Sequence, residues 1–538
     1  MKKINIACVI FSVLMASGCY KDKGNYDYTD IKRVEIQFDK ISSYTITQGD
    51  VLEVNPIYPD FVLTNPDNYE FTWYLNDETR PEWNTMNFKW QINDLMERGN
   101  LVIEVRDKST DVKYMNRATV TVNGVYTNYY SWMILSDDGG KSKLSFLSVN
   151  GLLDPDSADQ PQGSDQYYYD GERFITNVYN GDLGSGPIAL QEHWREGIDY
   201  SETVVGNVCV FQKSGAVDLE GTGFTKEIDM VDAFVGQKYP ASNTVLYPGS
   251  FIQYADVVCD QDGKLYSRLK LSDNVYNSEY FLQSPLKVRG EEEVLENCRV
   301  CRGYYTSNRF GYQVVYDGKN KRFLYFQDGG SSWDTPAEGA SAIVPVKVDS
   351  KLYLEDVVHL DNHNGYELLH LCQSAATGAG WNSYYGFYEV LREEATDKLF
   401  LQQFILTKKY GADSPDIQSI TKKEIKGLPG IPSVMAFPIY RPLEYAFFAI
   451  GKKLYMVDLV NMSDAELYYE FDSDITAMDY GSSSNLHLAV GLEDGSFFVL
   501  GANAAKNIKD EHKLVYKAPE KVGKIVDIKY KNNSMWNY

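Results

Sequence analysis

Apolar and polar side chains alternate through most of the chain, and this pattern predicts short β-strands. In residues 26–124 the candidate strands are separated by turn-forming residues and lie at 32–38, 44–56, 69–75, 100–107 and 117–122. Trp73, in the middle of the third strand, is expected to fill the core, and residues 107–111 (DKSTD) predict a tight turn. The segment is therefore expected to form an Ig-like β-sandwich that has no cysteine.

From about residue 125 onward one theme repeats, in which an apolar strand, a tight turn and a second apolar strand follow one another. Seven such hairpins are predicted, at 132–147, 209–219, 256–269, 312–326, 366–391, 447–459 and 487–500. Irregular spacing of this kind suits propeller blades whose loops differ in length. We therefore expect an all-β chain in which residues 125–538 form a seven-bladed β-propeller.

The two ends of this segment predict how it closes. Residues 525–530 (IVDIKY) resemble 475–480 (ITAMDY), the first strand of a blade, yet no complete blade follows them. The missing strands are present at 132–147, so the last strand is expected to complete the first blade. Such closure removes exposed sheet edges.

The N-terminus predicts a lipoprotein signal peptide over residues 1–18. Two lysines precede an apolar stretch at 6–16, which is too short to span a membrane. Ala16-Ser17-Gly18 and then Cys19 match a bacterial lipobox, so Cys19 is expected to carry palmitate and other acyl chains. Residues 19–25 would form the lipidated tether.

Composition narrows the function classes without indicating a reaction. The 538 residues are 43% hydrophobic and 24% charged, which excludes wholesale disorder. The net charge of −23 should repel phosphate backbones, so no nucleic acid is expected as a partner. The 42 tyrosines and 24 phenylalanines favour strands.

Three segments carry a family resemblance: YKDKGNYDY (20–28) after Cys19, WYL (73–75) and IEVRDKSTDVKY (103–114). In these the chain resembles the PKD-like surface lipoproteins of Bacteroidetes. The resemblance implies a PKD/Ig-like module before a β-propeller, a lipid anchor in the outer membrane facing the cell exterior, and a part in nutrient uptake. It also implies SusC/SusD-like importers and neighbouring lipoproteins as partners. The surface-export signal of such proteins is typically acidic, whereas here it is Lys21-Asp22-Lys23.

Motifs that could support catalysis are incomplete. His359, His363 and His370 lack the H-E-x-x-H order and the helical setting of a zinc protease, and their flanks read as strands around an Asn-Gly turn. Residues 136–142 fit most of the Asp-box of sialidase-like propellers, which is a structural turn. We therefore predict no catalytic residue, no metal and no cofactor.

Two further groups have a simple structural interpretation. Asp154, Asp156 and Asp159 could offer oxygens to calcium, but their spacing fails the EF-hand pattern, and a solvated acidic loop is favoured. Cys298 and Cys301 form a lone C-x-x-C without a second pair, which favours buried thiols or an incidental disulfide over a zinc ribbon.

Ligand binding is expected at insertions that mix aromatic residues with Gly and Ser, namely 166–197, 331–341 and 373–386. The candidate residues are Tyr167, Tyr168, Tyr169, Trp194, Trp333, Trp381, Tyr384 and Tyr385. The alternative is that these aromatics only pack loops onto the propeller. The expected role is a non-catalytic accessory subunit of a SusCD-like importer, with a peptide or glycan ligand and a slight preference for peptides. The rival is an extracytoplasmic propeller enzyme, a glycoside hydrolase or lyase acting on glycans.

Overall fold

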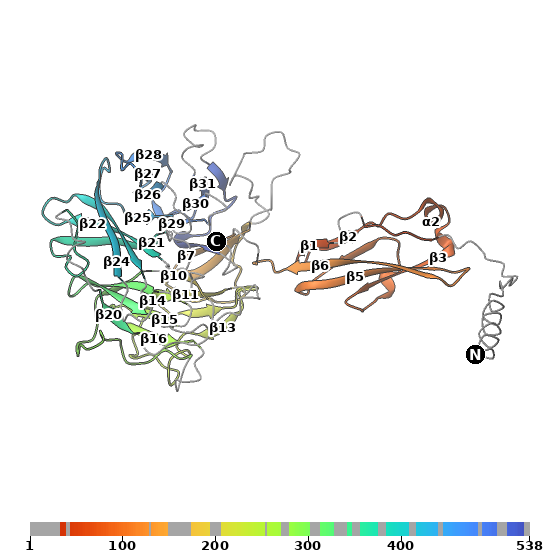
Figure 1. The fold of residues 1–538 in the computed structure, drawn as a ribbon, viewed down its shortest axis with the longest axis horizontal. Coiled ribbons are helices and arrows are strands. Elements are labelled where there is room, and N and C mark those ends of the chain that lie inside the picture. Colours follow the sequence, from red (N-terminus) through yellow and green to blue (C-terminus); the bar gives the residue numbers. More distant parts are fainter. Residues whose placement is uncertain are drawn as a thin grey trace, which may run out of the picture. The chain divides into compact units, whose positions relative to one another are not determined.

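The computed structural model divides the chain into two compact units, Met1–Asn123 and Gly124–Tyr538 (Figure 1). Each unit is described by itself below. The residues that the structure describes are 33–38, 43–127, 131–148, 174–193, 206–252, 255–270, 279–301, 312–327, 342–346, 356–374, 384–407, 416–438, 445–481, 487–502 and 514–531.

The first unit is a β-sandwich of two small sheets. Its larger sheet has the order β1-β6-β5-β3, in which β1 pairs with β6 in parallel, and its smaller sheet pairs β2 with β4. The strands are β1 (Ser43–Thr47), β2 (Val51–Val54), β3 (Tyr69–Leu75), β4 (Phe88–Gln91), β5 (Met96–Asp107) and β6 (Lys113–Asn123). A short helix α2 (Asp60–Thr64) and two 3-10 turns (Pro66–Asn68 and Pro81–Trp83) complete its described residues.

Aromatic packing holds this unit together. Trp73 is fully buried, as the sequence predicts, and its indole Nε1 donates a hydrogen bond to the Thr85 carbonyl oxygen at 2.9 Å. Its ring lies 5.3 Å from that of Phe88, which itself contacts Trp83 at the same centroid distance. The predicted 107–111 turn is also present, since Asp107 accepts hydrogen bonds from the backbone N–H groups of Ser109 and Thr110.

The structure of this unit differs from the prediction in three places. Residues 33–38 form only a single bridge, between Gln37 and Ile57, in place of the strand expected at 32–38. The strand expected at 44–56 is divided into β1 and β2, because Gly49 takes a φ of +88° and the chain turns there into the other sheet. Strand β4 was not predicted, since its four residues are too few to establish a period.

The described part of the second unit contains seven small sheets, six of four strands and one of three, each built on antiparallel pairs. All seven predicted hairpins are confirmed, and each lies in a different sheet. The first four sheets comprise β33-β7-β8-β9, β10 to β13, β14 to β16, and β17 to β20. Their strands are β7 (Ser131–Asp138), β8 (Lys141–Leu147), β9 (Phe174–Ile175), β33 (Lys524–Lys531), β10 (Pro187–His193), β11 (Asn207–Gln212), β12 (Val217–Leu219), β13 (Lys226–Asp229), β14 (Leu246–Phe251), β15 (Ala255–Asp260), β16 (Leu265–Leu269), β17 (Cys298–Val300), β18 (Tyr312–Asp317), β19 (Arg322–Gln327) and β20 (Ile343–Pro345).

The remaining three sheets follow in chain order as β21 to β24, β25 to β28, and β29 to β32. Their strands are β21 (Tyr366–Ser374), β22 (Tyr384–Glu393), β23 (Leu399–Thr407), β24 (Asp416–Ile425), β25 (Val434–Ala436), β26 (Tyr445–Ile450), β27 (Lys453–Asp458), β28 (Glu466–Glu470), β29 (Ile475–Tyr480), β30 (His487–Leu492), β31 (Phe497–Gly501) and β32 (Leu514–Lys517).

Hydrophobic clusters join each sheet to the next along the chain. Phe447 and Phe448 of β26 illustrate the principle, because successive side chains point to opposite faces of a strand. Phe447 packs with residues of β29 and β30, and Phe448 packs with residues of β22 and β23. Strands buried on both faces need continuous apolar runs, and this explains the runs in the sequence.

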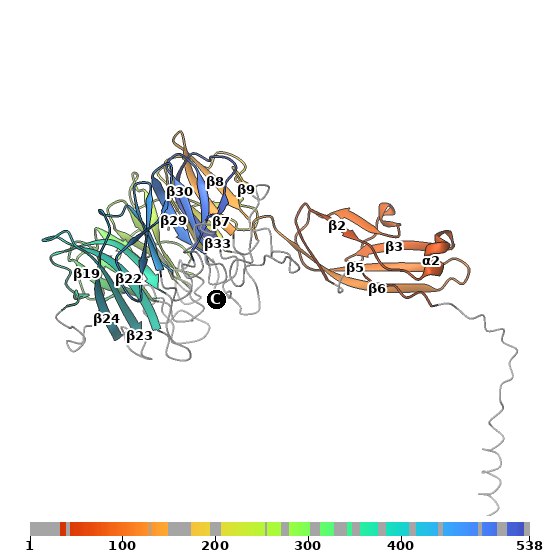
Figure 2. The same cartoon turned by 90° about the horizontal axis from the view of Figure 1, so that it is seen from above.

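The last strand closes the arrangement as predicted. β33 pairs antiparallel with β7, with Ile528 opposite Ile134, so the two lie side by side although their colours mark opposite ends of the unit (Figure 2). A cluster that includes Trp132, Ile528 and Val499 then packs this sheet against the β29–β32 sheet. The second unit is therefore a propeller-like assembly in which the final sheet contacts the first.

The predicted Asp-box turn is also a hairpin turn. Gly139 and Gly140 join β7 to β8 with φ values of +61° and +90°, a pair of left-handed conformations suited to glycine. The Gly140 N–H donates to Asp137 Oδ1 at 2.6 Å. The motif serves the turn, as the sequence indicates.

Candidate functional site

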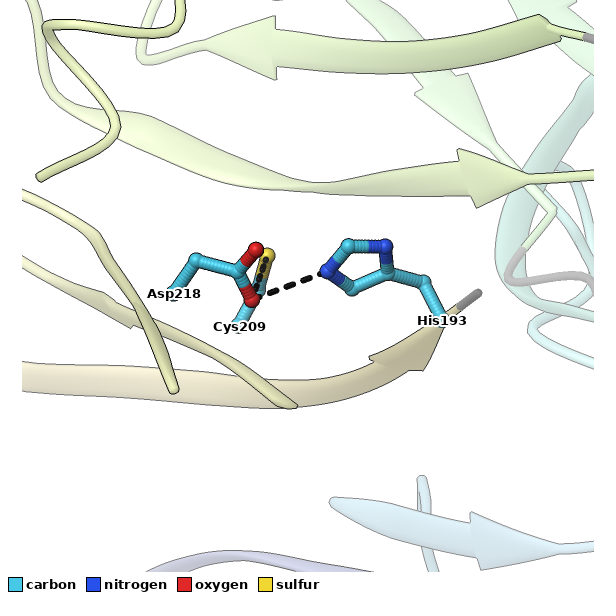
Figure 3. Close-up of side chains that lie close together, drawn as sticks. All are labelled: His193, Cys209 and Asp218. Carbon is cyan, nitrogen blue, oxygen red and sulfur yellow. Dashed lines mark hydrogen bonds and ion pairs between the residues drawn. The ribbon is translucent and has the colours of Figure 1, made fainter. Parts of the chain in front are cut away.

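Three polar side chains with metal-binding potential meet inside the β10–β13 sheet (Figure 3). Cys209 of β11 lies directly opposite Asp218 of β12 in the pairing register, so their side chains share a face of the sheet. His193 ends β10 two residues beyond Gln191, the partner of Cys209, and period-two alternation places it on that same face. The strand register therefore brings His193, Cys209 and Asp218 together.

The three groups are fully buried and interact with one another. His193 Nε2 lies 2.9 Å from Asp218 Oδ1, and the Cys209 thiol donates to the same oxygen at 3.6 Å. One ligand atom from each residue lies within 4.8 Å of the other two. The His193 ring also packs against the ring of Phe251 of β14, with 4.9 Å between the ring centroids, and this contact restricts the orientation of the imidazole.

The surroundings shift the pKa of the Cys209 thiol and that of the Asp218 carboxyl in opposite directions. Burial raises the pKa of the Cys209 thiol well above its usual value, and the negative charge of Asp218 raises this pKa further. Burial also acts to raise the pKa of Asp218, but the attraction of His193 and its hydrogen bond outweigh burial, so the pKa is lowered. Asp218 is therefore an ionised acceptor, and His193 Nε2 is the donor in their hydrogen bond.

A second charged group lies on the neighbouring β14–β16 sheet. Arg268 Nε donates to Asp256 Oδ2 at 2.8 Å, and Lys270 Nζ lies 3.2 Å from Asp256 Oδ1. The positive charge of Arg268 lowers the pKa of both Cys209 and Asp218. This arginine therefore favours negative charge in the buried group.

This site was not predicted from the sequence. Residues 166–197 were expected to be an inserted loop, but Phe174–Ile175 and Pro187–His193 are strands β9 and β10, so the expected loop conformation was wrong for these residues. The last three residues of β10, Gln191, Glu192 and His193, are polar and resemble a loop in the sequence, but all three are buried. The sequence did place Cys209 and Asp218 in one predicted hairpin. Adding His193 to them requires the register in which β10 pairs with β11, which the sequence does not show.

A second buried histidine pair involves one of the histidines considered from the sequence. His363 Nε2 lies 2.9 Å from Glu389 Oε2, and the Gln402 amide donates to Glu389 Oε1 at 2.7 Å. His370 lies on β21 and stacks on Phe437, and His359 forms a bridge with Asn362 in a turn. The three histidines therefore do not converge, in agreement with their interpretation as loop and strand residues.

The predicted ligand-binding residues fall mostly outside the described part of the chain. Tyr384 and Tyr385 begin strand β22, where they pair with Thr407 and Leu406 of β23. The remaining candidates, like Cys19 and the acidic group Asp154, Asp156 and Asp159, lie outside the described residues; they are Tyr167, Tyr168, Tyr169, Trp194, Trp333 and Trp381.

The C-x-x-C cysteines are separate buried thiols. Cys298 and Cys301 are not joined by a disulfide, and burial raises the pKa of each thiol well above its usual value. Cys298 packs with residues of β15 and β18, whereas Cys301 belongs to the cluster shared with β21 to β23. This agrees with the buried-thiol interpretation.

Within the described residues, no helix has the length and apolarity needed to cross a membrane.

Fold and site together define an all-β protein with a sandwich unit followed by a propeller-like unit. A model of the PKD-like family matches residues 19–180. This match contains the whole described sandwich and continues to strand β9 of the second unit.

No curated protein matches the chain. Among solved structures, apo AztD from Citrobacter koseri shares 11% identity over 86% of this chain and 97% of its own, with a TM-score of 0.33. BBS1N in complex with ARL6DN shares 12% sequence identity over 60% of this chain and 80% of its own, with a TM-score of 0.31. YCF48 bound to D1 peptide shares 8% sequence identity over 64% of this chain and 93% of its own, with a TM-score of 0.30. At these TM-scores the similarities carry no argument about this chain.

Proposed function

We propose that the protein is a lipid-anchored outer-membrane lipoprotein of the Bacteroidetes PKD-like surface type, and a non-catalytic accessory subunit of a SusCD-like TonB-dependent nutrient importer. The observation that carries this proposal is where the family match begins. It starts at residue 19, the cysteine that follows the predicted signal peptide. A match that begins at the cysteine of a predicted lipobox is what removal of a signal peptide and acylation of that cysteine would produce, so it supports the anchor, whereas the importer role rests on the family resemblance.

The propeller-like unit is proposed to be a closed seven-bladed propeller. Seven sheets and seven hydrophobic clusters between successive sheets support this, together with the pairing of β33 with β7. Closed propellers are rigid and have no long exposed strand edges, which suits a platform for binding loops.

The non-catalytic role is supported by the position of the reactive groups in the described residues. His193 with Asp218, and His363 with Glu389, are fully buried pairs that no external substrate can reach without opening the sheets. The ligand is proposed to be an oligopeptide or a glycan, bound by the aromatic insertions. Peptides remain the slight preference, on the family resemblance alone.

The anchor is tested by replacing Cys19 with Ala in cells fed labelled palmitate. The wild type is expected to incorporate label and fractionate with the outer membrane, and Cys19→Ala to lose both properties. Cys8→Ala is the matched control, because Cys8 lies inside the predicted signal peptide. Equal labelling of wild type and Cys19→Ala would contradict the anchor.

The non-catalytic role is tested by incubating the purified protein with panels of glycans and oligopeptides. Saturable binding without product is expected. Turnover that one carboxylate substitution abolishes would instead establish the glycan-active enzyme and contradict the proposal.

A further inference from the structure

We propose that His193, Cys209 and Asp218 form a structural zinc site inside the β10–β13 sheet, with His193 Nε2, Cys209 Sγ and a carboxylate oxygen of Asp218 as ligands. The proposal is independent of the transport role. It rests on donor chemistry, distances, charge balance and position in the sheet.

The donor set is that of a zinc site. Zn²⁺ is bound in proteins by thiolate sulfur, imidazole nitrogen and carboxylate oxygen. Calcium and magnesium take oxygen ligands almost exclusively, so a thiolate and an imidazole together argue against both. Met230 Sδ lies 3.9 Å from Cys209 Sγ, so a soft thioether lies beside the thiolate ligand.

Two of the three distances between ligand atoms are near those around a bound ion, and the third, between His193 and Cys209, is within 4.8 Å. At tetrahedral angles, with bonds of roughly 2.0–2.3 Å, ligand atoms around zinc lie about 3.3–3.6 Å apart. Here Cys209 Sγ and Asp218 Oδ1 are 3.6 Å apart, and the His193 and Asp218 atoms are 2.9 Å apart. The last pair must separate by a few tenths of an ångström, which a side-chain rotation provides.

Charge balance favours the ion in this interior. As zinc ligands, Asp218 would bind as a carboxylate and Cys209 as a thiolate, whose proton is released to solvent. Zn²⁺, one thiolate and one carboxylate then sum to zero, so no unbalanced charge is buried among the three ligands. The imidazole binds through Nε2, and its remaining proton moves to Nδ1, which is buried and has no hydrogen-bond partner in the described residues.

The position of the ligands indicates a structural role. They come from three adjacent strands, β10, β11 and β12, on the face that packs against the β14–β16 sheet. An ion bound there cross-links these strands through side chains as well as through the backbone ladder. A ligand that binds only the folded state stabilises it.

The His363–Glu389 pair provides a matched control in the same unit. It is equally buried, with the same 2.9 Å separation, but it has no cysteine beside it and belongs to no group of three metal-binding side chains in the described residues. A histidine–carboxylate pair alone is therefore not expected to hold zinc here.

The test uses the full-length lipoprotein in detergent, purified through a tag without histidine. Elemental analysis is expected to find about one zinc ion per chain, given three converging ligands. Chelation should lower the Tm by several degrees, and added Zn²⁺ should restore it. Co²⁺ in place of zinc should give a thiolate-to-metal charge-transfer band.

Cys209→Ser and Asp218→Asn, which nearly preserve shape, should lose the zinc, the Tm response and the cobalt band, whereas His363→Gln should keep all three. Retention of zinc by both site variants would overturn the assignment to these residues. A wild-type protein that takes up neither Zn²⁺ nor Co²⁺ after chelation, with its Tm unchanged, would overturn the site without any variant. Copper in place of zinc would overturn the choice of metal.

Discussion

At the scale of single residues, the second unit keeps several titratable groups in its interior. His487, at the start of β30, is one of them, and burial lowers its pKa to about 4. An unfolded chain binds a proton at this residue near pH 6.5, whereas the folded chain does so only near pH 4. Its contribution to stability is therefore complete above pH 6.5 and is lost as the pH falls toward 4.

Replacing His487 with Asn should remove part of the acid sensitivity of the protein. With one pKa unit equal to about 1.4 kcal/mol, the wild type should lose about 3 kcal/mol through this group between pH 6.5 and pH 4. The measurement is the denaturant midpoint of both proteins at several pH values. Parallel curves for the two proteins would show that His487 does not titrate in this way.

The cluster of His193, Cys209 and Asp218 could not be predicted from residue types alone. Cys209 and Asp218 lie in a predicted hairpin, but only the register shows that they are direct partners. The residues before His193 show no clear alternation of apolar and polar side chains, so the sequence did not define which face of a sheet its side chain would occupy. Side-chain clusters between strands depend on pairing, which a single sequence does not contain.

At the scale of elements, Trp73 is the central side chain of the sandwich. Trp73→Ala should destabilise the first unit by about 3–5 kcal/mol, because it leaves a cavity and removes the hydrogen bond to Thr85. Tyr74→Ala is the control, since Tyr74 points to the opposite face of β3 and is half-buried. Calorimetry should show the transition of the first unit lowered and that of the second unit unchanged.

Strand β33 is the element that joins the end of the second unit to its beginning. Deleting residues 520–538 removes it and exposes the edge of β7, so the shortened protein should aggregate and melt at a lower temperature. Deleting only 533–538 leaves β33 complete and is expected to have little effect. A 520–538 deletion that stays monomeric with the wild-type melting temperature would contradict closure by β33.

Elements were predictable where their signals are local. Apolar runs on both sides of a turn identified all seven hairpins, and at Gly139 and Gly495 the turn requires a left-handed backbone conformation that favours glycine. The sandwich strands were less predictable: β4 is too short, and the break at Gly49 interrupts an otherwise continuous alternation. Sheet membership, unlike strand existence, depends on long-range pairing.

At the scale of the whole molecule, one chain contains a sandwich and a propeller-like unit, and we propose that it is acylated at Cys19. Within its described residues, the propeller-like unit buries two histidine–carboxylate pairs, His193 with Asp218 and His363 with Glu389. The proposed anchor rests on the lipobox that ends at Cys19, and the proposed partners rest on the family resemblance of the sequence. The central claim is therefore an association with other proteins in the outer membrane.

The most direct measurement of that claim is to solubilise outer membranes gently, capture the protein through a tag placed after Tyr538, and identify what co-purifies. The account predicts a SusC/SusD-like pair in stoichiometric amount, retained across a range of salt concentrations and lost from the Cys19→Ala strain. Recovery of this chain alone at every salt concentration would contradict the importer role.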